Sequence, residues 1–301
     1  MKGPIKARNR AHGEIPTQAI GTLYVVSTPL GNLEDITLRA LRILKTVDLI
    51  AAETVQHTRR LCKHYGISTR LTRYNQHNRK AKGPELIEKL KAGMDIALVT
   101  NAGTPGISDP GVFLVGQALK EQVTVSPIPG PSAVTAALSV AGLRGDRFVF
   151  LGFLPNKSSK RSHELKTLLS ESRTLVFFEA PHRLRAMLLD IKEIFGEREI
   201  VLLREMTKVF EEVKRGSTGT MLDQLEGHEI RGELTVVVAG KEKADEPRSL
   251  DEEIQSRIRI LLDEHKMSVK DMARQLCAET GLAFRDLYKA GISVKRGMRP
   301  S

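Results

Sequence analysis

Short runs of apolar residues recur along the chain, and most of them are separated by stretches with helical periodicity. Each run is three to five residues long, and most are rich in Val, Ile and Leu, which is typical of buried strands. Strands that alternate with helices predict an α/β fold with a largely parallel sheet. The predicted strands are residues 23–26, 47–50, 96–99, 123–125, 148–150, 175–178, 200–203 and 234–238.

The stretches between these runs carry apolar faces and start signals of helices. Leu38, Leu41 and Leu44 recur at helical spacing on one face. Pro84 and Pro181 each stand at a plausible first helical position, where the N–H that proline lacks has no partner inside a helix. We therefore expect helices to connect the strands.

The chain divides at a turn, Gly-Leu-Arg-Gly-Asp, at residues 142–146. Blocks of β/α units stand on both sides of this turn, which predicts two α/β lobes, residues 21–143 and 144–241, enclosing a cleft. A basic tail at residues 1–20, expected to be flexible, precedes the first lobe. A charged linker at residues 241–249 ends the second lobe.

Residues 250–292 show the pattern of three short helices. Ser268, with Asp271 in the position of a capping-box acid, predicts the start of the second helix, and Gly281 predicts its end. The appendage is either a helix-turn-helix or a structural cap over the second lobe, and both interpretations stay open. The apolar stripes of the three helices are Ile254, Ile258, Leu261 and Leu262, then Val269, Met272, Ala273 and Leu276, then Phe284, Leu287 and Tyr288.

Composition adds a charge argument to this picture. Lys and Arg outnumber Asp and Glu by 47 to 36, a formal net charge of +11, which favours a polyanionic partner, nucleic acid before an acidic membrane surface. No run approaches the roughly 20 apolar residues that span a bilayer, and no signal core precedes residue 20, so we expect a cytoplasmic protein without membrane attachment. Cys62 and Cys277 stand alone among apolar residues, so neither a disulfide nor a metal site is expected.

Three loops rich in Gly and Pro follow strands of the first lobe, at residues 28–32, 101–111 and 127–133. The carboxyl ends of parallel strands share one edge of the sheet, where helix amino termini present free N–H groups to ligands. The loops therefore predict a small-molecule site. None of them matches the P-loop or the G-x-G-x-x-G fingerprint, so ATPase and dinucleotide chemistry lack their motifs.

The composition of the loops suits an adenosine-containing ligand. Gly103 and Gly106 allow close approach of the backbone. Thr104 and Ser108 supply hydroxyls for polar edges of the ligand, and Ser132 is predicted to cap the helix that follows it.

Six motifs follow one another along the chain: T-P-L-G-N-L-E-D-I-T-L-R-A-L at 28–41, A-G-T-P-G-I-S-D-P-G at 102–111, P-G-P-S-A at 129–133, G-F-L-P at 152–155, F-E-A-P-H-R at 178–183 and R-E-M-T-K at 204–208. In this order they resemble the tetrapyrrole methylase superfamily and, within it, the 16S ribosomal RNA (cytidine-2′-O)-methyltransferases. The resemblance covers about residues 20–240 and extends weakly to S-V-K-D-M-A at 268–273.

The resemblance implies a two-lobed class III methyltransferase fold with a small helical appendage, and a homodimer that binds S-adenosyl-L-methionine in its cleft. The implied substrate is a cytidine ribose of 16S ribosomal RNA within the small ribosomal subunit. Carried over position by position, the implied cofactor contacts are Pro29, Gly31, Asn101, Ala102, Gly103, Thr104, Ile107, Ser108, Ser132, Ala133 and Phe178.

The chain departs from the family pattern at two places. Asn101 stands where the pattern has Asp, and Thr54, Val55 and Gln56 stand where it has Asp-Thr-Arg. Asn keeps the reach of Asp but loses its charge, so a role in orienting the substrate survives the change better than a role in accepting a proton.

Methyl transfer from a sulfonium to a hydroxyl needs aligned reactants and a group that helps remove the hydroxyl proton, but no metal. Glu179, Glu205 and Lys208 are the predicted catalytic residues, and His182 is a further candidate in the same region. The alternatives are an ion pair of Glu205 with Arg204 or Lys208, and for His182 a place at a helix amino terminus or on an RNA phosphate.

Basic clusters at residues 79–82, 157–161, 183–185 and 295–296 suit contacts with an RNA backbone. Aromatic residues make up only 4% of the chain, so recognition by shape and phosphates is expected rather than base stacking. Two alternatives remain: a tetrapyrrole (precorrin or uroporphyrinogen) C-methyltransferase, whose substrate is also a polyanion, and a non-catalytic rRNA-binding assembly factor.

Overall fold

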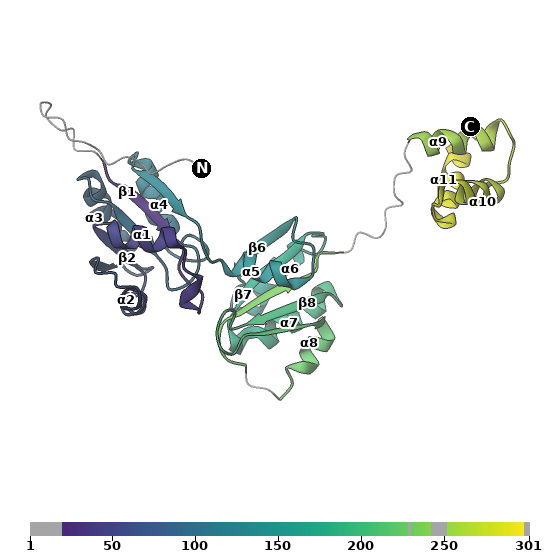
Figure 1. Ribbon diagram of the computed structural model, residues 1–301. Coiled ribbons are helices and arrows are strands. Elements are labelled where there is room, and N and C mark those ends of the chain that lie inside the picture. Colours follow the sequence, from purple (N-terminus) through teal and green to yellow (C-terminus); the bar gives the residue numbers. More distant parts are fainter. Residues whose placement is uncertain (1–19, 228–229, 242–251, 298–301) are drawn as a thin grey trace, which may run out of the picture. The chain divides into compact units, whose positions relative to one another are not determined.

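The computed structural model describes residues 20–227, 230–241 and 252–297 (Figure 1). The chain divides into two compact units, Met1–Lys241 and Glu242–Ser301. The basic tail and the charged linker predicted from the sequence fall almost wholly on residues 1–19 and 242–249, which lie outside the described residues. No helix in the described ranges is long and apolar enough to cross a membrane.

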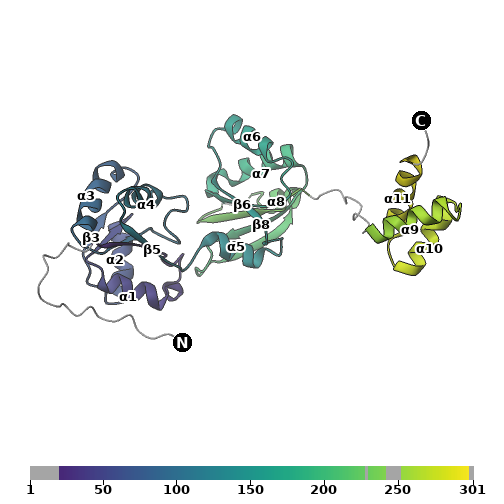
Figure 2. The ribbon, with the colours of Figure 1, turned by 90° about the horizontal axis from the view of Figure 1, so that it is seen from above.

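The first sheet is parallel throughout, with the strand order β3-β2-β4-β1-β5. Helices cover both of its faces, as parallel sheets require (Figure 2). Its strands are β1 (Thr22–Val26), β2 (Leu49–Ala52), β3 (Leu71–Arg73), β4 (Ile96–Val99) and β5 (Thr124–Ile128). The helical segments of this part of the chain are η1 (Leu33–Asp35), α1 (Leu38–Thr46), α2 (Val55–His64), α3 (Arg79–Lys91), α4 (Gly111–Lys120) and α5 (Ala133–Ala141).

Strand β4 shows how the sequence assigns residues to the two faces of this sheet. Ala97 and Val99 pack in the cluster that contains residues of α1 and α2, whereas Ile96 and Leu98 pack in the cluster that contains residues of α3 and α4. Successive side chains of a strand point to opposite faces. A continuous apolar run is therefore required here, because both faces are buried.

The second sheet has the order β6-β7-β10-β8-β9. Only β6 and β7 pair in parallel, and the other pairs are antiparallel. The expectation of a largely parallel sheet is therefore right for the first sheet and wrong for the second. The elements are β6 (Phe148–Phe153), α6 (Ser158–Thr167), β7 (Thr174–Glu179), α7 (Pro181–Phe195), β8 (Glu199–Arg204), β9 (Glu212–Ser217), α8 (Thr218–Gln224) and β10 (Leu234–Val238).

Helices also cover both faces of the second sheet. Apolar residues of α6, α7 and α8 pack on the face that contains Leu175 and Phe177 of β7. Helix α5 packs on the opposite face, against Val176, Val201 and Val237. Helix α5 precedes the predicted boundary at residues 142–146, so the loop before it, residues 129–132, connects the first sheet to a helix that packs on the second.

Three local predictions are wrong in detail. Pro84 lies inside α3, which begins five residues earlier, because Arg79 N–H already donates to the Asn75 carbonyl in a preceding turn (3.0 Å). Leu38 begins α1 but is exposed, since the buried face of α1 consists of Ala40, Ile43 and Leu44. The strand predicted at residues 47–50 is β2, which begins at Leu49.

The second unit consists, in its described part, of α9 (Glu252–Asp263), α10 (Val269–Thr280) and α11 (Phe284–Gly297). The first two predicted stripes contribute to its core, with Ile258, Met272, Ala273 and Leu276 buried, but of the third stripe only Leu287 is buried, and Phe284 and Tyr288 are exposed. The Ser268 hydroxyl accepts a hydrogen bond from the Asp271 N–H (3.1 Å), and Gly281 ends α10 in the left-handed conformation. Both end signals of this helix are confirmed.

Candidate functional site

The three Gly and Pro loops of the first lobe meet at the carboxyl edge of the first sheet, as predicted. Thr28 and Gly103 exchange two backbone hydrogen bonds of 2.9 Å, which tie the first loop to the second. The Thr104 hydroxyl donates to the Pro131 carbonyl (3.1 Å), and the Ser27 hydroxyl donates in turn to Thr104 (2.9 Å). Thr104 thus joins all three loops, and Gly103 adopts a φ of +76° that an L side chain rarely takes.

A cavity of about 440 Å³ lies beside these loops; we call it the first cavity. Residues at the ends of β7 and β10 complete its wall, among them Phe178 and Thr235. Nine of the eleven predicted cofactor residues line it: Asn101, Ala102, Gly103, Thr104, Ile107, Ser108, Ser132, Ala133 and Phe178. Ser132 is the N-cap residue of α5, but its side chain makes no capping bond, so the predicted cap is wrong and the hydroxyl is left to the cavity.

Carboxylates give the first cavity its charge. Four acidic residues line it, Glu53, Asp109, Glu179 and Glu233, and no Lys, Arg or His is among the described residues of its wall. Asp109 accepts backbone N–H groups from Gly106 (2.7 Å) and Gly111 (2.6 Å), which hold its loop in shape. The first cavity is therefore suited to a ligand that carries positive charge.

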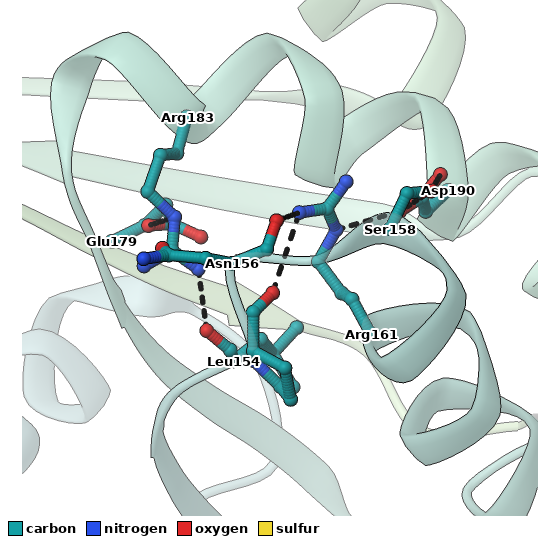
Figure 3. Close-up of polar contacts among 8 residues, drawn as sticks. Leu154, Asn156, Ser158, Arg161, Glu179, Arg183 and Asp190 are labelled. Carbon is teal, nitrogen blue, oxygen red and sulfur yellow. Dashed lines mark hydrogen bonds and ion pairs between the residues drawn. The ribbon is translucent and has the colours of Figure 1, made fainter.

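Glu179, a predicted catalytic residue, ends β7 with its side chain buried (Figure 3). Its Oε1 accepts the Ala180 N–H (2.7 Å) and lies 3.1 Å from Nε of Arg183. Burial raises the pKa of this carboxyl, against the opposing effects of the Ala180 N–H and the Arg183 charge. Its Oε2 is buried without a hydrogen-bond partner in the described structure, so one oxygen is left for a ligand.

Two arginines anchor the loop that follows β6. Arg161 forms a buried ion pair with Asp190, with Nε and Oδ2 2.6 Å apart, and donates to the carbonyls of Pro155 (3.4 Å) and Asn156 (3.2 Å) (Figure 3). Arg183 donates to the Leu154 carbonyl. The loop thus held begins after Phe153, which lines the first cavity. These two arginines are committed to internal contacts, so the predicted basic clusters at 157–161 and 183–185 contain fewer free charges than their composition indicates.

A second cavity, of about 520 Å³, adjoins the first. The two share five wall residues: Leu30, Thr100, Asn101, Ala102 and Glu233. The two remaining predicted cofactor residues, Pro29 and Gly31, line this second cavity and not the first. The buried Oδ1 of Asn101 has no partner in the described structure, and Asn101 faces both cavities.

Lys208 lines the second cavity and forms ion pairs with Glu205 (2.8 Å) and Glu233 (3.1 Å). The hydrogen bond from Lys208 lowers the pKa of Glu205, which lines neither cavity. The structure therefore agrees with the alternative interpretation of Glu205, an ion pair with Lys208. A Cβ at Gly31 would lie 2.2 Å from Cγ of Lys208, so only glycine at this position leaves room for the Lys208 side chain.

His182 lies at the start of α7 and lines neither of the two cavities. Sequence reasoning missed several wall residues of the first cavity. Glu53 follows β2 at the carboxyl edge and Asp109 lies within a predicted loop, so position alone pointed to both. The position of Thr235 in the sequence did not indicate a wall residue, because Thr235 lies inside the apolar run of a predicted strand. Among the described residues, no group of His, Cys, Asp or Glu could hold a metal ion.

Comparison with known proteins identifies the architecture. The family described as Tetrapyrrole (Corrin/Porphyrin) Methylases matches residues 22–222. The fold resembles a uroporphyrin-III-C-methyltransferase from Thermus thermophilus, with a TM-score of 0.51 and 22% identity over 73% of this chain and 92% of that one. It also resembles a diphthine synthase, with a TM-score of 0.56 and 15% identity over 73% and 90% of the two chains. The protein is thus a tetrapyrrole methylase in its fold.

Curated relatives narrow this class. "Ribosomal RNA small subunit methyltransferase I" of Synechocystis sp. is 43% identical over 277 residues, 92% of this chain and 99% of its own. The protein of the same name from Thermotoga maritima is 46% identical over 223 residues, 74% and 100% of the two chains. The chain therefore belongs to the ribosomal RNA small subunit methyltransferase I family of the tetrapyrrole methylases. It is a methyltransferase, and the predicted resemblance and fold class are confirmed.

Proposed function

We propose that the protein transfers the methyl group of S-adenosyl-L-methionine to the ribose 2′-hydroxyl of a cytidine in small-subunit ribosomal RNA. The proposed substrate is 16S ribosomal RNA within the small ribosomal subunit, and the proposed active form is a homodimer. The observation that carries the proposal is the acidic first cavity at the ends of the strands of a tetrapyrrole methylase fold. The names of the relatives supply small-subunit ribosomal RNA as the substrate, and the resemblance of the sequence motifs implies the cytidine 2′-hydroxyl as the acceptor.

The residues of the first cavity fit S-adenosylmethionine. Its volume falls within the range of small-molecule pockets, roughly 300–1,000 Å³. Carboxylates complement the positive charges of the donor, and the apolar side chains of Leu30, Ile107 and Phe178 offer a surface for an adenine ring. The unpartnered oxygens of Asn101 and Glu179 can accept hydrogen bonds that the described structure leaves unmade.

Bound S-adenosylmethionine would supply a methyl group attached to a positively charged sulfur. The ribose oxygen would attack the methyl carbon in line with the carbon–sulfur bond, and the sulfur would leave. The free Oε2 of Glu179 would take the hydroxyl proton as the oxygen–carbon bond forms and the carbon–sulfur bond breaks. A carboxyl whose pKa is raised by burial is a stronger base than an exposed one. Asn101, at the wall between the cavities, would orient the acceptor through its Oδ1.

Lys208 and Glu205 would act as positioning residues. Their ion pair holds the segment after β8 across Gly31. The Asn32 N–H donates to the Thr207 hydroxyl (3.1 Å) in the same region. This segment also contributes Met206 to the wall of the first cavity, so the ion pair would act on methyl transfer through the shape of that wall.

Ribosomal RNA is a better-supported acceptor than a tetrapyrrole. The two relatives described above, both named for small-subunit ribosomal RNA, are 43% and 46% identical over most of the chain, whereas the uroporphyrin methyltransferase is 22% identical. Positive charge suits either substrate. A non-catalytic assembly factor would not need an acidic cavity with unpartnered buried oxygens.

The test is incubation with radiolabelled S-adenosylmethionine and small ribosomal subunits that lack the modification. Digestion of the RNA to nucleosides should place the label in 2′-O-methylcytidine. The Glu179→Gln variant is the matched control and should bind the donor in calorimetry but transfer little label. Label on a base atom, label in uroporphyrinogen but not RNA, or no heat of donor binding would contradict the proposal.

A further inference from the structure

The wall of the second cavity contains basic side chains, which the wall of the first lacks in the described structure. His57, Arg60 and Lys208 line it, and Glu233 is its only acidic wall residue in the described structure. Glu233 is 75% exposed and lies 3.1 Å from Lys208, so its charge is both solvated and paired. Within the described ranges, Arg60 forms no ion pair that would offset its positive charge, and His57 adds an imidazole that can donate a hydrogen bond.

One face of α2 forms part of this wall. Thr54, His57, Thr58 and Leu61 all line the cavity, and their spacing places them on one side of the helix. Thr54 is the N-cap residue, its side chain makes no capping bond, and the first turn of α2 contains no acidic residue. The positive end of the helix dipole therefore lies at the cavity, and the neighbouring carboxylate of Glu53 is bonded to the Asn101 N–H (3.1 Å).

Thr58 is an independent indication of a ligand. The residue lines the cavity and is only 2% exposed, yet its Oγ1 has no hydrogen-bond partner in the described structure. A buried hydroxyl without a partner is costly, and such groups normally have one. The missing partner would be supplied by an acceptor atom in the cavity.

The geometry points to a backbone phosphate as that acceptor: we propose that the second cavity binds the phosphate next to the methylated ribose, with Thr58, His57 and Arg60 as its donors. This inference rests on the proposed function and assigns the acceptor side of the same site. Asn101, which lines both cavities, would then lie between the phosphate site and the donor site, where the ribose hydroxyl meets the methyl group. A phosphate carries several acceptor oxygens, which matches the hydroxyl, the imidazole and the guanidinium that line one cavity.

Two variants and their matched controls test the assignment. Arg60→Ala removes a cation of the cavity wall, and Arg59→Ala removes a cation of the same helix that does not line the cavity. Thr58→Val removes the buried hydroxyl at equal volume, whereas Thr58→Ser keeps it. The measurements are the affinity for a 16S ribosomal RNA fragment at several salt concentrations, KM for small subunits, and donor affinity by calorimetry.

Arg60→Ala should weaken RNA binding five- to tenfold and lower the salt slope by about one, as loss of a phosphate contact does. Thr58→Val should weaken binding several-fold with the slope unchanged, and Thr58→Ser should restore it. Donor affinity should stay constant in all four variants. If Arg60→Ala and Arg59→Ala change RNA affinity equally while the unmodified protein methylates RNA, the phosphate site is overturned and the proposed function stands. Failure of the unmodified protein to bind or methylate RNA would overturn the proposed function, and the phosphate site with it.

Discussion

The buried pair of Arg161 and Asp190 should dominate the stability of the second lobe. Their side chains are only 5% and 12% exposed, and Nε lies 2.6 Å from Oδ2. Removal of one partner from a buried ion pair leaves an uncompensated charge and typically costs about 3–5 kcal/mol. Arg161→Met should therefore lower the free energy of unfolding by about that amount, a change of about two to four powers of ten in the ratio of folded to unfolded protein at roughly 1.4 kcal/mol each.

The double variant Arg161→Met with Asp190→Leu separates charge from packing. It removes both charges at once, so it should be destabilised by less than half as much as Arg161→Met. The control is Arg144→Ala, whose ion pair with Asp146 is exposed on both sides and whose loss should leave the unfolding curve unchanged. Urea denaturation followed by circular dichroism measures all three.

Arg161 also holds the loop that follows Phe153, so its loss should reach the first cavity. Below the unfolding temperature, Arg161→Met should bind S-adenosylmethionine several-fold more weakly, because the carbonyls of Pro155 and Asn156 lose their donor. If Arg161→Met unfolds at the same urea concentration as Arg144→Ala, the reasoning about the buried pair is refuted.

Three further variants test the site. Glu179→Gln should slow methyl transfer by about 10²–10⁴-fold. Because burial raises the pKa of Glu179, ionisation of this carboxyl destabilises the fold as pH rises from its unfolded-state pKa, near 4.3, through its higher folded-state pKa. The Gln variant should therefore gain stability relative to the unmodified protein across that pH range, as measured by melting temperature. Asn101→Asp should strengthen donor binding several-fold in calorimetry, since a charged hydrogen bond exceeds a neutral one by about 1 kcal/mol; equal affinity would show that position 101 is structural. Gly31→Ala should displace Lys208 and reduce both activity and melting temperature, whereas Gly145→Ala, where a Cβ has open space, should change neither.

The position of the first cavity was predictable because it follows from a rule of parallel sheets. Loops that are far apart in the sequence meet when each follows a strand of the same parallel sheet, and the bonds of Thr104 to two of the loops show that meeting. The division into two cavities was not predictable. Pro29 and Gly31 belong to the same loop edge as Asn101, and only side-chain packing decides which cavity each one faces.

Strand β9 and the antiparallel order of the second sheet escaped prediction for a different reason. Strand β9, Glu212–Ser217, contains a single large apolar residue, Val213, and lies at the edge of its sheet, so it lacks the apolar run that marks a buried strand. Strand β10 carries a strong run, but its antiparallel place between β7 and β8 depends on chain topology. Local patterns identify strands and do not order them.

Electrostatic attraction acts in this protein at two distances, over long range through the net charge and at contact through the carboxylates of the first cavity. The net charge of +11 attracts a polyanion from a distance, and salt screens that attraction beyond about 8 Å at physiological ionic strength. The carboxylates of the first cavity act on a ligand at contact, where little screening water and salt intervene. A cationic donor can therefore bind to a cationic protein. The two affinities should therefore differ in their dependence on salt. RNA affinity should fall steeply as the salt concentration rises, because added salt opposes the release of counterions. The affinity for S-adenosylmethionine should change little over the same range of salt concentration.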